Sequence, residues 1–121
     1  MKFMLMIWSG ELTQEEIESD SVKDVFREYI KWTEEMQKAG VLVSNEGLAP
    51  SRTAKTVSVR DGQKLVADGP FAETKEQLLG LFLIDVEDEA EAVHWAEVSA
   101  PATHGWVEVR ALHDARAVIK L

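Results

Sequence analysis

The chain has 121 residues, 45% of them hydrophobic and 29% charged, which are the length and composition of one soluble globular domain over residues 1–121. Its 13 basic and 22 acidic residues give a net charge of −9, a field that repels phosphates and anionic lipids, so we expect neither nucleic-acid nor membrane binding. The absence of cysteine excludes disulfides, thiolate nucleophiles and cysteine zinc sites, and it fits a cytoplasmic location.

The first predicted element is a strand from Phe3 to Trp8. It is apolar on both faces, a pattern typical of a strand that is covered on both sides. The same run is too short for a signal-peptide core or a membrane span, and Ser9-Gly10 ends it.

Two capping-box patterns then predict helix starts. Thr13–Glu16 predicts a short helix, and Ser21–Asp24 predicts the start of a longer one that ends at Gly40. Apolar or half-polar residues recur three and four apart in the longer helix and form one stripe: Val22, Val25, Phe26, Tyr29, Thr33 and Met36. We expect this stripe to pack on a sheet. A short strand at Val41–Val43 and a turn at Ser44–Gly47 follow.

The middle of the chain predicts a β-hairpin. Thr56–Arg60 alternates strictly, so we expect one buried and one polar face. Asp61-Gly62 is a strong two-residue hairpin signal, and Gln63–Ala67 is the returning strand. Leu78–Ile84 is a second strand that is apolar on both faces, and Gly80 within it allows another backbone or side chain to come close.

The C-terminal third predicts one helix and one strand. Asp88–Glu91 caps a helix that runs to about Val98, and Pro101 ends it. Residues 106–110 alternate again and form the last strand, and the tail at 113–121 has no clear pattern.

This order, β-α-β, a hairpin, then β-α-β, predicts an α+β fold with an antiparallel sheet and two main helices on one face. Two helices leave the second face of Phe3–Trp8 and Leu78–Ile84 uncovered. The same sheet of a second subunit is the simplest cover, so we expect a homodimer joined through the sheet faces.

The segment from Asp68 to Glu76 connects the hairpin to the second apolar strand. Gly69 can adopt a positive φ and Pro70 fixes its own φ, so the bend between them is stiff. Charged side chains surround the bend: Asp68, Glu73, Lys75 and Glu76. This loop is either a functional site or a solvated turn, and spacing alone does not separate the two.

Three further groupings could carry chemistry. Glu108 and Arg110 lie with Trp106 on one face of the last strand, where they could bind a polar ligand or form an ion pair at a subunit interface. His104 precedes that strand in a loop and is either a candidate general base or simply a polar surface residue. The predicted turn after the strand at Val41–Val43 would hold the Glu46 carboxylate in a defined direction.

No metal or cofactor motif is present. The histidines are far apart in sequence, with no H-x-x-x-H or HExxH pattern, no G-x-S-x-G elbow and no glycine-rich phosphate loop. We therefore expect no metal and no organic cofactor.

The run DGPFAETKEQL at 68–78, with the apolar strand after it, resembles the signature of the DGPF, or YCII-related, family of small bacterial proteins. The resemblance extends to Gly40–Leu48, Arg60–Gly62 and Gly105–Arg110. It implies a ferredoxin-like fold in a dimeric α+β barrel. Members are often encoded beside extracytoplasmic-function sigma factors, so it also implies a possible role in that signalling.

The chain departs from this family's common pattern at three places, Leu79, Leu81-Phe82 and Ala111. A histidine–aspartate pair proposed as catalytic in distant relatives uses an early histidine. This chain has no histidine before His94, so that pair is not transferred to it.

Two functional hypotheses follow. The first is a small-molecule-binding homodimer whose pocket lies between the sheet, the Asp68–Glu76 loop and the last strand, with a small polar metabolite as ligand. If it is an enzyme, cofactor-free acid–base catalysis by Asp68, Glu73 and His104 is the expected class, and Glu46, Lys75, Glu76, Glu108 and Arg110 are the expected ligand-binding residues. The second is an interaction module whose acidic surface docks a sigma factor.

A pocket lined by the loop favours the first hypothesis, and a flat acidic patch favours the second. For the first, we expect at least one loop carboxylate, Asp68 or Glu73, to face a cavity together with His104 or Arg110.

Overall fold

The computed structural model describes residues 1–120, and its centre is an antiparallel sheet of four strands in the order β2-β5-β1-β6. The bounds of these strands are β1 Lys2–Ser9, β2 Leu42–Gly47, β5 Gln77–Asp85 and β6 Trp106–Ala111. The two strands whose sequences are apolar on both faces, β1 and β5, occupy the two central positions, because only a central strand has both edges paired and both faces available for packing.

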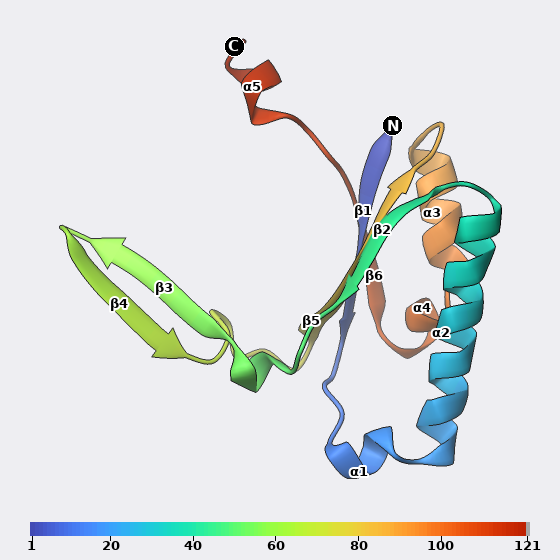
Figure 1. Cartoon of the computed structure of the whole chain (residues 1–121), viewed down its shortest axis with the longest axis horizontal. Coiled ribbons are helices and arrows are strands. Elements are labelled where there is room, and N and C mark those ends of the chain that lie inside the picture. The colour runs from blue at the N-terminus through green and yellow to red at the C-terminus, as the bar shows by residue number, and fades with distance from the viewer. Residues whose placement is uncertain (121) are drawn as a thin grey trace.

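A separate two-stranded sheet is formed by β3 and β4, Lys55–Arg60 and Gln63–Asp68. Asp61 and Gly62 at its turn both have positive φ, 51° and 76°, as the predicted hairpin turn requires. Figure 1 shows this hairpin extending away from the main sheet. The expected buried face is therefore wrong for the single chain, where Val57 and Val59 are more than half exposed.

The helices complete an α+β architecture. Their bounds are α1 Gln14–Ile17, α2 Asp20–Lys38, α3 Glu89–Glu97, α4 Ala100–His104 and α5 Ala115–Val118, with a short 3-10 turn, η1, at Ser51–Thr53. In Figure 1, α2, α3 and α4 lie on one side of the main sheet and the hairpin extends from the other side. The ferredoxin-like α+β fold expected from the sequence is confirmed, and within residues 1–120 the face of the sheet opposite α2, α3 and α4 has no helix packed on it.

The core lies between the sheet and α2 and α3. Its fully buried large side chains come from three elements: Phe3, Leu5, Phe82, Ile84 and Met36. Trp32 packs on Phe82 with ring centroids 4.8 Å apart, and its indole N–H donates a 3.0 Å hydrogen bond to the carbonyl of Trp95. Helix α2 is thus joined to both β5 and α3.

Three boundaries differ from the expectations. Ser19, whose hydroxyl accepts from the N–H of Val22, caps α2 two residues before the expected start. Ser99 caps the separate helix α4, so Pro101 lies in the first turn of a helix, where a missing N–H costs nothing, instead of ending the preceding one. The residues expected to form a turn at 44–47 continue β2, because their backbone pairs with β5.

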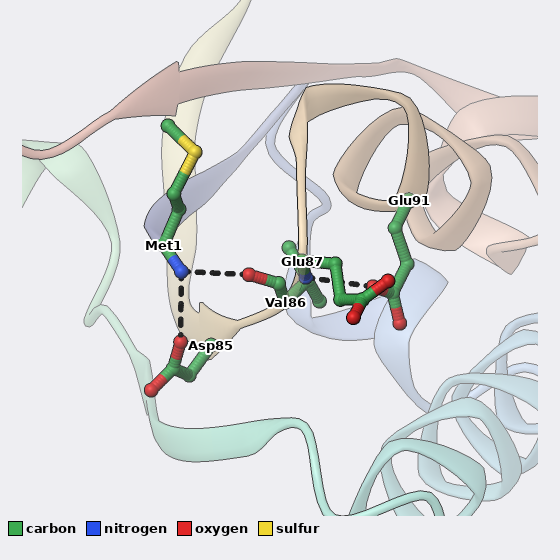
Figure 2. Close-up of polar contacts among 5 residues, drawn as sticks. All are labelled: Met1, Asp85, Val86, Glu87 and Glu91. Carbon is green, nitrogen blue, oxygen red and sulfur yellow. Dashed lines mark hydrogen bonds and ion pairs between the residues drawn. The ribbon is translucent and has the colours of Figure 1, made fainter.

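The N-terminus is held beside the end of β5. As Figure 2 shows, the amino group of Met1 contacts the Asp85 carboxylate at 3.2 Å and donates to the carbonyl of Val86 at 2.7 Å. The N–H of Glu87 donates to the Glu91 carboxylate at 2.8 Å, which supports the start of α3. Within residues 1–120, no helix combines the length and hydrophobicity needed to cross a membrane.

Candidate functional site

An apolar pocket of about 440 Å³ lies on the helix side of the sheet, between the end of β1, the first half of α2 and α4. Hydrophobic side chains form most of its wall: Ile7, Leu12, Val22, Val25, Phe26 and Leu79. The N-terminal half of the α2 stripe lines this pocket, whereas its C-terminal half, with Met36, is in the core. The stripe is therefore divided between the wall of the pocket and the core.

Tyr29 places a hydroxyl group on the wall of this apolar pocket. The hydroxyl oxygen lies 3.4 Å from where a Cβ on Gly80 would be, and the carbonyl oxygen of Glu46 lies 3.1 Å from that same point. Within the described residues no hydrogen bond to the hydroxyl is found, although the Tyr29 carbonyl accepts from Thr33. Burial raises the pKa of Tyr29 to about 12, so the hydroxyl stays protonated and can donate to a ligand.

His104 lies at the same pocket, as the last residue of α4 and not in a loop as expected. Its carbonyl accepts a hydrogen bond of 3.4 Å from the Ser9 hydroxyl, which joins α4 to the end of β1. Gly105 allows this approach, because a Cβ there would lie 2.3 Å from the carbonyl oxygen of Trp8. The absence of a side chain at Gly105 therefore positions His104 at the pocket.

A second hollow, of about 550 Å³, lies at the Asp68–Glu76 segment, and we call it the motif hollow. Charged side chains from three parts of the chain line it: Glu11, Arg52, Asp68, Glu73 and Lys75. Asp68 forms an ion pair with Lys55, but the Asp68 side chain is 86% exposed, so water screens this pair strongly. The motif hollow is a polar surface site.

The segment between β1 and α1 separates the two cavities. Gly10 and Leu12 line the apolar pocket, and Glu11 between them lines the motif hollow. The Glu11 carboxylate accepts hydrogen bonds from the hydroxyl and the N–H of Ser51, the latter at 2.6 Å. These bonds, the hydroxyl first, lower the pKa of Glu11. The segment is therefore tied to η1 across the motif hollow.

A third group lies on the uncovered face of the sheet. The Glu108 carboxylate accepts a 3.1 Å hydrogen bond from the indole N–H of Trp8 and forms an ion pair with Arg110. Glu46 is opposite Leu81 on β5, in the same row across the sheet as Met6 and Glu108. Side chains alternate between faces along a strand, so this row lies away from the helices.

The structure brings some of the expected site residues together and separates others. Asp68, Glu73 and Lys75 share the motif hollow, and Glu76 is adjacent but does not line it. Neither His104 nor Arg110 lines that hollow, so the expected pairing with a loop carboxylate is not formed within the single chain. Residues 10–12 stand between His104 and the loop, and Arg110 lies on the uncovered face.

Sequence reasoning placed Tyr29 in a packing stripe and missed it as a site residue. A usable signal was present, because Tyr29 is the one tyrosine of the chain and its hydroxyl follows the apolar residues Val22, Val25 and Phe26 in the stripe. Among residues 1–120, no group of three or more histidine, aspartate or glutamate side chains is arranged to hold a metal ion.

Comparison with known proteins identifies the family. A model of the YCII-related domain matches residues 1–116 of the chain. An uncharacterised protein of Rhizobium meliloti (strain 1021) is 38% identical over 107 residues, which cover 87% of this chain and 79% of that relative. The residues that the family model matches include the whole main sheet, the apolar pocket and the motif hollow. The chain belongs to the YCII-related domain family.

Proposed function

We propose that this protein is a homodimer that binds a small molecule in the apolar pocket, and that the ligand has an apolar body and one hydrogen-bond acceptor. The observation that carries the proposal is a protonated Tyr29 hydroxyl without a hydrogen bond in the described residues, on the wall of a hydrophobic cavity. A cavity of about 440 Å³ falls in the size range of small-molecule sites, which are mostly apolar with a few placed polar groups.

The hydrophobic lining favours such a ligand over the small polar metabolite expected from the sequence. Burying a polar ligand group without a partner is costly, and the polar groups at this pocket are few: Tyr29, Ser9 and His104. A ligand with a single carbonyl or hydroxyl oxygen, which would accept a hydrogen bond from Tyr29, matches this small number of polar groups.

Cofactor-free acid–base chemistry is the catalytic part of the proposal. Tyr29 would donate to a carbonyl oxygen of the ligand, and His104 would take a proton from the neighbouring carbon. The hydrogen bond from Tyr29 strengthens as negative charge develops on that oxygen, which is how a placed donor accelerates proton abstraction. Asp68, Glu73, Lys75 and Glu76 remain a proposed polar subsite on the other side of residues 10–12.

The homodimer is supported by the uncovered sheet face. Met4, Met6 and Trp8 of β1 and Leu81 and Leu83 of β5 lie there, with Trp106 of β6 68% exposed. A contiguous apolar face of this kind indicates an interaction site. It also argues against the sigma-factor module, for which a flat acidic patch without a pocket was expected.

The binding proposal is tested by filling the pocket. Val25→Phe extends a pocket-lining side chain of α2 into the cavity, and Ile30→Phe makes the same kind of change on the same helix at a side chain that is 55% exposed. A panel of small aryl and alkyl ketones, alcohols and acids is screened by thermal shift against both variants and the parent protein.

We expect ketones or alcohols that raise the melting temperature of the parent and of Ile30→Phe but not of Val25→Phe. Tyr29→Phe should bind the same compounds about tenfold more weakly, the usual effect of losing one hydrogen bond to a ligand. A panel without hits, or hits that Val25→Phe retains, contradicts the proposal. For a ketone hit, hydrogen–deuterium exchange next to the carbonyl should slow in His104→Gln.

A further inference from the structure

The hairpin of β3 and β4, Lys55–Asp68, is an arm that stands away from the rest of the chain (Figure 1). Its two strands pair with each other, and neither packs extensively on another helix or strand within residues 1–120. A hairpin of two strands is at best marginally stable in water unless something packs on it. The arm therefore needs a covering surface that this chain does not supply.

One face of the arm is apolar. Val57 is opposite Val66, and Val59 is opposite Lys64 on the same face. The three valines are 59%, 49% and 58% exposed in the order Val57, Val66, Val59. The other face carries the polar side chains of Thr56, Ser58, Arg60 and Gln63 together with Ala67 and Leu65, which is 64% exposed, so the valine face is the more apolar of the two.

The arm extends from the side of the main sheet opposite α2, α3 and α4 (Figure 1). A second copy docked on this uncovered face would stand beside the arm, and by two-fold symmetry its own arm would reach back to the first copy. Six-residue strands at roughly 3.4 Å per residue extend about 20 Å, twice the roughly 10 Å that separates packed sheets. The arm is long enough to pass the sheet of the partner.

The uncovered face by itself is small for an interface. Four strands about 4.8 Å apart and on average about 25 Å long offer roughly 480 Å² per copy. Two copies would bury roughly 960 Å², whereas stable interfaces bury about 1,200–2,000 Å² in total. Two arms in contact with the partner would supply the missing area.

We infer that each arm packs its Val57, Val59 and Val66 face against a second copy of this chain, and that the Asp68–Gly69 corner holds the arm at the angle this contact needs. The inference rests on the homodimer of the proposed function and adds the arm as an element that holds the two copies together.

The contacts at the base of the arm support this role for the corner. Gly69 has a φ of 95°, and its N–H donates to the carbonyl of Ala54 at 2.7 Å. The Thr56 hydroxyl donates to the Gly69 carbonyl at 2.9 Å, and Asp68 pairs with Lys55 across the last rung of the arm. Asp68 and Gly69 are thus bonded to residues 54–56 at the base of the arm, at the end of the hairpin nearest the main sheet.

The test replaces the three arm valines by threonine, Val57→Thr, Val59→Thr and Val66→Thr together. Threonine keeps the shape and the strand preference of valine and loses only hydrophobicity, so the hairpin itself is preserved. The matched control is Val93→Thr with Val98→Thr, two valines of the α3 region that are 45% and 51% exposed on the helix side. Sedimentation velocity over a range of concentrations measures the dimer dissociation constant, and circular dichroism checks folding.

We expect the dissociation constant to rise about tenfold or more in the arm variant, since six methyl groups leave the symmetric interface, and to stay unchanged in the control. A parent dimer whose association is equally strong in the arm variant overturns the inference and leaves the homodimer standing. A monomeric parent overturns both. Gly69→Ala, strained at its positive φ, should weaken the dimer as well, and a Gly69→Ala dimer as tight as the parent contradicts the role of the corner.

Discussion

At the scale of single residues, the proposed ligand binding depends on Tyr29. Its ring packs edge-on against Phe82, with centroids 5.4 Å apart, so the side chain is fixed by the core. Its hydroxyl is at the pocket wall, close to Gly80. The Tyr29 hydroxyl is thus oriented toward the pocket by the packing of its ring. A donor oriented before the proposed ligand binds reduces the entropy lost on binding.

The ionisation of Tyr29 should be visible directly. Because the chain has one tyrosine, the near-ultraviolet absorbance of tyrosinate reports this residue alone. We expect a midpoint near pH 12 in the folded protein and near the ordinary value of 10.0 in urea. A folded midpoint at the ordinary value would show that water reaches the hydroxyl freely.

The same shift predicts how stability depends on pH. Below pH 10 the tyrosine is protonated in both states, and between pH 10 and pH 12 the unfolded chain loses the proton that the folded chain keeps. The free energy of unfolding should therefore fall across this interval, by roughly 1–2 kcal/mol for a partly exposed group. Urea titrations of the parent and of Tyr29→Phe isolate the effect, since only the parent carries the phenolic hydroxyl at position 29.

At the scale of elements, the junction between α4 and β6 joins the pocket to the sheet. The chain passes from His104 through Gly105 into Trp106, which pairs with Trp8 on β1. The close approach at Gly105 lets α4 lie against the end of β1. The position of His104 is thus set by strand pairing and not by the helix that carries it.

Substituting Gly105 should disturb this junction. The added Cβ in Gly105→Ala would meet backbone at 2.3 Å, so β6 or α4 must shift, and we expect unfolding to be easier by roughly 1–3 kcal/mol. Gly47→Ala is the control, because no atom lies within 4 Å of its added Cβ. Urea unfolding measures both variants, and equal stability of the two would show that the junction tolerates a side chain.

At the scale of the whole molecule, the sheet has one face on helices and one face open. The open face carries a central apolar strip with charged groups at its sides: Glu46 at the β2 edge, and Glu108 and Arg110 at the β6 edge. An apolar centre with a polar rim is the usual anatomy of a protein interface.

The dimer should therefore fail when a charge is placed in that strip. Leu83 lies between Ser44 and Met4 across the sheet, and Leu83→Lys would bury an unpaired ammonium group if a second copy docks there. We expect the parent to sediment as a dimer at micromolar concentration and Leu83→Lys as a folded monomer. Ile30→Lys, on the helix side, should remain a dimer, and loss of its dimer would place the interface elsewhere.

Much of the fold could be read from local patterns. Phe3–Trp8 and Leu78–Ile84 were predicted as strands from their continuous apolar runs, and Asp61-Gly62 specifies a turn with two positive φ values. Asp88 was likewise expected at the start of α3 because a side-chain acceptor there satisfies the N–H of Glu91. Each of these features depends either on residues a few positions apart in the sequence or on hydrophobic periodicity alone.

The candidate site could not be read in this way, because it depends on which surfaces tertiary packing leaves empty. The sequence predicted Glu46 in a turn, but its backbone pairs with β5 and Glu46 lies in β2. Val25 was predicted to pack in the core, but it lines the apolar pocket. His104 and the Asp68 loop looked like neighbours, but the tether from Glu11 to Ser51 holds residues 10–12 between them. Hydrophobic periodicity and local backbone geometry were sufficient to predict the strands and the helices α1, α2 and α3. Which polar groups share a cavity follows from tertiary packing, since long-range strand pairing sets where each side chain points.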